Sequence, residues 1–226
     1  MKTLKKLAAA AALIALSGAA QAALVNRGGG MIYDTTRNIT WLADMNYAQT
    51  SGHTGTGVNT TDGRMTWDAA TAWADNLVYG AFSDWRLPTL NPTDASCTGG
   101  YGVGKGLDCT GGELSGLFVT ELGNKGNQSV LNPAGDTAEQ IANLAMFSNV
   151  RSDAYWSGTE GTLNPNRAFY FHANFGSQDF AGKGNSFYAV AVRPGDVAVA
   201  VPEPQTLTLV LLALGATVVA RRKRPA

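Results

Sequence analysis

The chain has 226 residues, of which 45% are hydrophobic and 15% are charged, with 17 basic against 17 acidic side chains. Seven basic residues lie in the two terminal segments described below, so residues 23–201 hold ten basic and sixteen acidic side chains, a net charge of about −6. This charge argues against nucleic acid, heparin-like polymers or anionic lipid headgroups as partners. The length between the terminal segments suffices for one domain with a hydrophobic core.

The first 22 residues have the pattern of a secretory signal peptide. A positive stretch is followed by an Ala/Leu-rich run and a small-x-small cleavage site (Lys2, Lys5 and Lys6; 7–16; Ala20 and Ala22). Signal peptidase recognises this order of charge, apolar run and small residues. We therefore expect an exported protein whose mature chain starts at Ala23.

The first part of the mature chain predicts strands followed by helices. Residues 28–42 are read as two short strands around a polar turn at 34–38, and the Gly/Thr-rich stretch 51–63 is read as a loop. Thr66 is a candidate N-cap for an amphipathic helix over 67–79, and the apolar spacing at 113–122 predicts a second helix.

Cys97 and Cys109 are the only cysteines, and they bracket a Gly-rich stretch with little preference for an ordered state. In the oxidising compartment of an exported protein, a disulfide is the expected arrangement. A redox pair usually has Cys-x-x-Cys spacing and a zinc site needs two more ligands, neither of which lies nearby in the sequence.

The last third of this region alternates with a period of two. Phe169, Phe171, Ala173 and Phe175 are expected on one face of a strand over 168–175, with Tyr170, His172 and Asn174 on the other. A turn at 176–177 leads to a return strand, and 187–193 alternates again. Two early helices and a late antiparallel sheet predict a compact α+β domain.

Three elements follow one another at the C-terminal end. A short tether at 197–201 precedes Pro202-Glu203-Pro204, then an apolar run at 206–220, then a basic cluster (Arg221, Arg222, Lys223 and Arg224). The prolines predict an extended, protease-accessible step, and the apolar run predicts a helix in lipid with the basic cluster on the cytoplasmic side. At about 1.5 Å per residue the run spans roughly 22 Å, short of the ~30 Å hydrocarbon core, which favours a transient retention signal over a permanent anchor.

This tail, residues 202–226, resembles the PEP-CTERM sorting signal of Gram-negative bacteria. The resemblance implies cleavage near Pro-Glu-Pro by the membrane enzyme exosortase. It also implies passage through the inner membrane to the cell surface or extracellular matrix. The alternative, an ordinary tail anchor, gives the same topology.

The domain itself, expected over 23–196, has landmarks of its own. They are a Trp-Arg-x-Pro step, a Tyr-Trp pair and an arginine near the end of the domain (Trp85, Arg86 and Pro88; Tyr155 and Trp156; Arg193). These residues resemble the family related to the C-terminal domain of Lcl, a collagen-like adhesin. The resemblance implies a C-type-lectin-like or formylglycine-generating-enzyme-like fold, with the Cys97–Cys109 segment as an insertion.

The landmarks also have a physical interpretation. Buried indole N–H groups need acceptors, and the arginines could bond carbonyls or pair with acids such as Asp84. We interpret Trp85, Trp156, Arg86 and Arg193 as scaffold, with a ligand platform as the alternative.

Candidate catalytic and metal-binding residues are few. The chain has two histidines, His53 and His172, and lacks Gly-x-Ser-x-Gly, His-Glu-x-x-His and phosphate-cradling motifs. A hydrolase using His172 with Asp179 or Asp153 remains an alternative. The formylglycine-generating activity does not transfer, because its reactive cysteine pair belongs in the C-terminal core.

A ligand loop is a further alternative. Asn174, Asp179 and Asn185 flank the last strands, where a lectin-like domain would place calcium or sugar. We expect no resident cofactor and no metal, with calcium as the open alternative. The sequence therefore predicts a non-enzymatic exported surface or matrix protein, processed by signal peptidase and exosortase and associated with exopolysaccharide and biofilm. The alternatives are a carbohydrate- or calcium-binding module and a secreted hydrolase.

Overall fold

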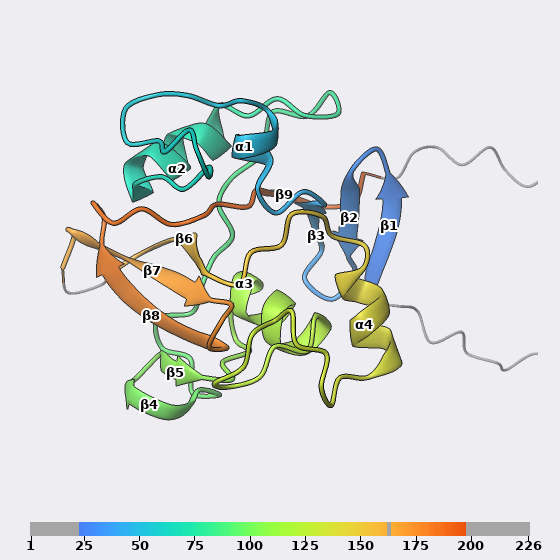
Figure 1. Ribbon diagram of the computed structural model, residues 1–226, viewed down its shortest axis with the longest axis vertical. Coiled ribbons are helices and arrows are strands. Elements are labelled where there is room, and N and C mark those ends of the chain that lie inside the picture. Colours follow the sequence, from blue (N-terminus) through green and yellow to red (C-terminus); the bar gives the residue numbers. More distant parts are fainter. Residues whose placement is uncertain (1–22, 162–163, 198–226) are drawn as a thin grey trace, which may run out of the picture.

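The computed structural model describes residues 23–161 and 164–197 (Figure 1). The predicted signal peptide at 1–22, the Pro-Glu-Pro segment and the apolar run at 206–220 lie outside the described residues. Among the helices of the described ranges, none has the length and apolar character to cross a membrane.

Two antiparallel sheets form the frame of the domain (Figure 1). The first has the order β1-β2-β3-β9 and the second the order β4-β5-β8-β7-β6. The strands of the first sheet are Leu24–Gly28, Met31–Asp34, Ile39–Leu42 and Val192–Pro194. Those of the second, in sheet order, are Thr98–Gly102, Lys105–Leu107, Ser177–Gly182, Arg167–His172 and Ala154–Glu160. The predicted α+β class is confirmed.

The turn between β2 and β3 lies where the sequence predicts it. The Asp34 carboxylate accepts the backbone N–H groups of Thr36 and Arg37, at 3.0 and 2.9 Å, which is the local bonding that makes Asp a turn residue. Asn38 completes the turn in the left-handed region at φ 52°. The two strands then pair in regular register from Met31 opposite Leu42.

The helices are short. They are α1 at Tyr47–Thr50, α2 at Trp67–Asp75, α3 at Glu113–Ser115, the π-helix η1 at Gly116–Glu121 and α4 at Ala138–Leu144. The predicted helix over 67–79 ends four residues early, because the Leu77 N–H bonds the Ala74 carbonyl instead of the Trp73 carbonyl, and Tyr79 pairs with Phe82 outside the helix. The predicted helix over 113–122 is found as α3 and η1.

The sequence analysis did not predict α1 or α4, although α4 carries a readable signal. The Thr137 hydroxyl accepts the Gln140 N–H at 3.1 Å, and the Gln140 side chain accepts the Thr137 N–H at 3.0 Å. This is a capping box, whose sequence signature is Thr-x-x-Gln.

The late strands follow the predicted alternation with one exception. Phe169, Phe171 and Ala173 are buried, whereas the placement of Phe175 on the same face is wrong, since this side chain is 47% exposed. The strand ends at His172, and the chain turns before β8, so the period of two no longer applies at Phe175.

Cys97 and Cys109 form the predicted disulfide. The stretch between them, whose composition has little preference for an ordered state, forms the β4–β5 hairpin. Pairing of β5 with β8 joins this hairpin to the second sheet, so the Cys97–Cys109 segment gains backbone hydrogen bonds that its composition does not predict.

The core has two parts. One lies around Phe118, Tyr155 and Phe171, and the other lies beneath α2 around Trp73 and Trp156. Val197, which the sequence analysis assigned to the tether, is 6% exposed and packs in the second part, so the fold extends to that residue.

Candidate functional site

The two landmark arginines make paired contacts with carboxylates. Arg193 donates to both Asp84 oxygens at 2.8 and 2.9 Å, as the sequence interpretation allowed. Arg86 donates to both Glu113 oxygens at 2.7 Å, a partner that the sequence did not indicate. Burial raises the pKa of Glu113, but the bonds from Arg86 and from the Thr89 N–H outweigh it, and the net pKa is lowered. Such two-bond pairs fix the strand and helix ends that they join.

The landmark tryptophans differ in their hydrogen bonding. Trp156 is fully buried and donates its indole N–H to the Met65 carbonyl at 2.9 Å. Trp85 is 2% exposed, and its indole N–H has no acceptor within the described part of the chain. Both side chains belong to the core, as expected for scaffold residues.

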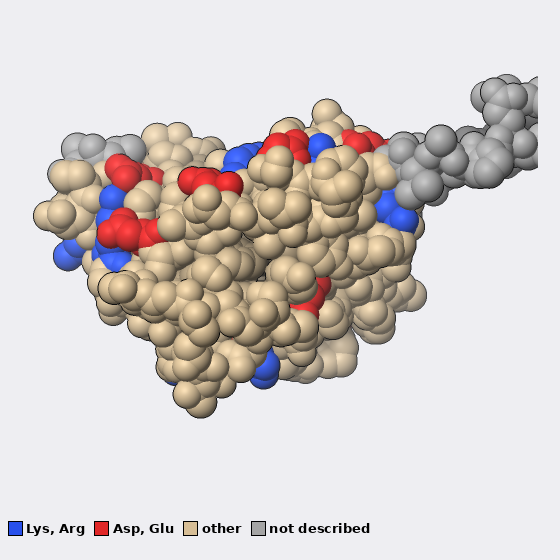
Figure 2. All heavy atoms as spheres, turned by 90° about the horizontal axis from the view of Figure 1, so that it is seen from above, with Lys and Arg blue, Asp and Glu red and all other residues tan. Residues whose placement is uncertain are grey.

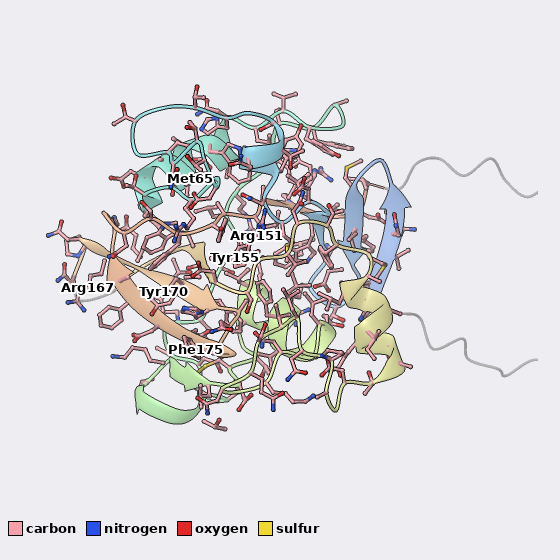
Figure 3. All side chains as sticks on the ribbon, viewed as in Figure 1. Met65, Arg151, Tyr155, Arg167, Tyr170 and Phe175 are labelled. Atoms are coloured by element: carbon pink, nitrogen blue, oxygen red, sulfur yellow. A yellow bond between two sulfur atoms is a disulfide. The ribbon has the colours of Figure 1, made fainter. Side chains whose placement is uncertain are left out.

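A row of aromatic rings lies along one face of β7, where Tyr170 and Phe187 pack at the margin of the second part of the core. It runs from Phe187 to Tyr170 at 4.9 Å between ring centroids, from Tyr170 to His172 at 6.4 Å, and from His172 to Phe175 at 4.6 Å. The buried Trp156 supports one end, 4.5 Å from Phe187. We call Phe187, Tyr170, His172 and Phe175 the aromatic row. Figure 3 shows Tyr170 on β7 and Phe175 at the turn that leads to β8.

A hollow of about 350 Å³ adjoins the aromatic row. Tyr170, His172 and Phe175 line it on one side, and polar side chains line it on the other (Asn127, Ser177 and Asp179). Partly exposed rings beside amide, hydroxyl and carboxylate groups form a surface that can stack on an apolar face and also exchange hydrogen bonds. Strands β7 and β8 position the groups on Tyr170, His172, Ser177 and Asp179, since His172 and Ser177 lie opposite each other in the register. Asn127 and Phe175 lie in turns, where the Asn127 N–H bonds the Phe175 carbonyl at 2.9 Å.

The electrostatics around His172 favour the neutral ring. Burial lowers the pKa of His172, and the Asp153 carboxylate opposes this shift only in part. The Nε2–Oδ1 distance to Asp153 is 3.9 Å, and Nδ1 accepts the Asn174 N–H at 3.4 Å. Asp179 instead accepts the N–H of Phe180. Within residues 23–161 and 164–197, no hydroxyl or thiol hydrogen-bonds to His172, so the contact that activates a nucleophile in a hydrolase is absent there.

The three proposed calcium ligands do not form one loop. Asn174 lies in the turn before β8 and accepts the Ser152 hydroxyl at 3.0 Å. Asn185 lies beyond the other end of β8 and donates to the Gly182 carbonyl at 2.8 Å. A six-residue strand separates them, roughly 20 Å at about 3.3 Å per residue, and Asp179 lies between.

One group of metal-type side chains is close together in space. Carboxylate and sulfur atoms of Asp94, Cys97 and Cys109 lie within 4.8 Å of one another. The disulfide occupies both sulfurs, and the Asp94 carboxylate accepts the N–H groups of Ser96 and Gly111 at 2.9 and 2.7 Å. These residues close the base of the β4–β5 hairpin and leave no free ligand set.

The second histidine belongs to a different surface. His53 lines an open hollow of about 550 Å³ between the 51–58 loop and α2, together with Tyr47 and Trp73. It is therefore separate from the aromatic row, and the structure places no carboxylate among the lining residues of this hollow.

Surface charge is sparse and mixed on the face that Figure 2 shows. Acidic and basic side chains lie side by side there, and uncharged residues cover most of the area. The predicted mature charge of about −6 is therefore not gathered into one acidic patch on this face.

Comparison with known proteins gives one match, outside the described residues. Residues 200–224 match the family model of the PEP-CTERM protein-sorting motif. The chain carries a sorting signal. This motif supports export through the membrane-associated exosortase system to the cell surface, with exosortase as processing enzyme. Among curated proteins and solved structures, none matches the chain.

Proposed function

We propose that this PEP-CTERM protein is a non-enzymatic surface or matrix protein that binds exopolysaccharide through its aromatic row. The sorting motif at 200–224 supports delivery to the outside of the cell. The observation that carries the binding role is the continuous set of partly exposed rings beside the 350 Å³ hollow. Sugars present apolar C–H faces and hydroxyl groups, and this surface offers partners for both.

The same proposal includes the finer predictions from the sequence. The domain takes a C-type-lectin-like arrangement related to the Lcl C-terminal family. Signal peptidase releases the chain at Ala23, and exosortase releases it near Pro202-Glu203-Pro204 at the inner membrane of a Gram-negative bacterium. The product then joins the biofilm matrix. The intact mass of protein recovered from host membranes and culture fluid tests both cuts, because a species ending at Ala226 would contradict the processing.

Binding can be tested on the purified full chain with immobilised host exopolysaccharide. We expect Phe175→Ser to weaken retention about fivefold, since covering a half-exposed ring contributes on the order of 1 kcal/mol. Ile141→Ser is a matched control, because Ile141 is also 47% exposed and lies on α4, beside the first sheet and not beside the β7–β8 hairpin (Figure 1). Equal retention of wild type and Phe175→Ser would contradict the proposal.

Two further measurements separate the alternatives. Retention should survive a calcium chelator, and a loss on chelation would favour a calcium-dependent module. Incubation of the protein with the polymer should release no new reducing ends. If wild type does release them, and a correctly folded His172→Ala variant does not, the hydrolase alternative is favoured.

A further inference from the structure

A second hollow lies at the other end of the β7–β8 hairpin, on the opposite face from the aromatic row. Lys105 of β5 and Arg167 of β7 both stand over the ring of Phe180, with Nζ at 4.4 Å and Cζ at 4.9 Å from its centroid. The three residues line a hollow of about 240 Å³ together with Val103. Figure 3 shows Arg167 at the end of the hairpin away from Phe175. We call Lys105, Arg167 and Phe180 the cationic cradle.

The disulfide-closed hairpin builds one wall of the cradle. Gln178 is fully buried and donates its amide to the Gly104 carbonyl at 2.7 Å and to the Asn91 carbonyl at 3.1 Å. Gly104 has φ +70°, and a Cβ there would clash with the Pro92 carbonyl. The turn that presents Lys105 is thus held in one position before any ligand arrives.

The two cations lack acidic partners. Among the described residues, neither the Lys105 ammonium nor the Arg167 guanidinium makes an ion pair or a hydrogen bond to a carboxylate. By contrast, most other described cations are paired with acids (Arg27, Arg37, Arg64, Arg86, Lys125, Lys183 and Arg193). Two like charges held against one ring repel each other, and an anion placed between them would convert that repulsion into attraction.

We propose that the cationic cradle binds one carboxylate-bearing sugar unit, a hexuronate, of an exopolysaccharide. The carboxylate lies between Lys105 and Arg167, whose planar guanidinium can engage both oxygens. The C–H face of the sugar rests on Val103, which is 73% exposed, while Phe180 holds the two cations in place. A hollow of about 240 Å³ is below the ~300–1,000 Å³ range for drug-sized ligands, which suits a single ring.

The charge of the whole domain restricts the polymer class. A domain with a net charge of about −6 repels densely charged anionic polymers at long range, so a polymer carboxylate is attracted only within the cradle. The cradle therefore selects isolated carboxylates on a largely neutral chain over heavily sulfated polymers. This inference rests on the proposed function for the identity of the polymer, but the site can be tested without it.

The test is ligand-observed saturation-transfer NMR on the purified full chain, with glucuronate, glucose and acetate as probes. We expect transfer to glucuronate, with glucose and acetate at least tenfold weaker. Lys105→Gln and Arg167→Gln should each weaken glucuronate binding fivefold or more. Lys183→Gln is the matched control, because its ammonium also stands over a ring, that of Trp67 at 4.0 Å, but pairs with Glu160.

The contradicting results are equally defined. Glucuronate binding that equals glucose binding, or that survives both cradle variants with circular dichroism unchanged, would overturn the site. Acetate binding as tight as glucuronate would overturn recognition of the sugar ring, and tighter Lys105-dependent binding of heparin would overturn the selectivity. Glucuronate binding is compared between wild type and the two cradle variants, and retention on exopolysaccharide between wild type and Phe175→Ser, so failure of the cradle and failure of the aromatic row are distinguishable.

Discussion

Two buried tryptophans allow the contribution of one hydrogen bond to be measured by the same chemical change. Trp156 and Trp85 are 0% and 2% exposed, but only Trp156 has an acceptor for its indole N–H among the described residues. Replacing each by phenylalanine removes a similar amount of packed ring. The two variants should therefore differ mainly in what happens to the N–H group.

The magnitude follows from the local bonding. Trp156→Phe loses one hydrogen bond, worth about 1 kcal/mol net, while the Met65 carbonyl keeps a second donor, the Phe187 N–H at 3.0 Å. Trp85→Phe removes an unpaired buried N–H, whose burial costs about 1–3 kcal/mol. We expect Trp156→Phe to be the more destabilising variant by about 2 kcal/mol.

The assay is urea unfolding of the purified full chain followed by circular dichroism. With a slope of about 2 kcal/mol/M, the two midpoints should differ by about 1 M at equal slopes. Trp41→Phe is a second control, because Trp41 is fully buried and its N–H is also unpaired within the described ranges. Equal or greater destabilisation by Trp85→Phe would refute the reasoning.

Three further predictions concern charge and backbone. Glu113→Gln should lower the free energy of unfolding by about 1–3 kcal/mol at pH 7, because it breaks the ion pair with Arg86. Because the pKa of Glu113 is lowered in the fold, the extra stability of wild type over the variant should disappear as pH falls below 4.5, and urea midpoints measured against pH will show this loss. The pKa of His172 is lowered from 6.5, so wild-type stability should fall as pH drops below 6.5, and His172→Asn should not show this decrease in thermal unfolding. Gly176→Ala should lower the free energy of unfolding, measured in urea, by about 2 kcal/mol or more, because Gly176 has φ +56° and a Cβ there would clash with the Lys125 carbonyl. An unchanged free energy of unfolding would contradict this argument.

Local signals in the sequence predicted much of the secondary structure. The Asp34 turn and the β7–β8 hairpin around Gly176 depend on contacts within a few residues. Helix α2 starts after Thr66 as predicted, but the Thr66 side chain makes no capping bond, and the Trp67 N–H bonds the distant Lys183 carbonyl. The capping box at Thr137 is equally local and was readable. Where an element ends was less predictable, because α2 stops where Tyr79 pairs with Phe82 instead of continuing the helical hydrogen bonds.

The candidate site shows the limit of such reasoning. Alternation placed Tyr170 and His172 on one face of a strand, but Phe187 joins the aromatic row from another segment of the chain. Likewise, the sequence did not connect Lys105 to Arg167, or Arg86 to Glu113, because each pair meets only through tertiary packing.

The sequence by itself identified the C-terminal sorting signal, because recognition of such a segment depends on the contiguous order of proline, apolar length and charge. The N-terminal signal peptide is read from the same kind of contiguous pattern and stays a prediction. The match at 200–224 agrees with that interpretation for the C-terminal segment. Only the tertiary structure decided the conformation of the Cys97–Cys109 segment. The glycine-rich composition of this segment favours no particular secondary structure. The segment forms a hairpin because β8 offers unpaired backbone groups to β5 and because the Gln178 side chain donates to the carbonyl of Gly104 in the turn. Long-range hydrogen bonds of this kind connect residues more than seventy positions apart, and no local pattern encodes them.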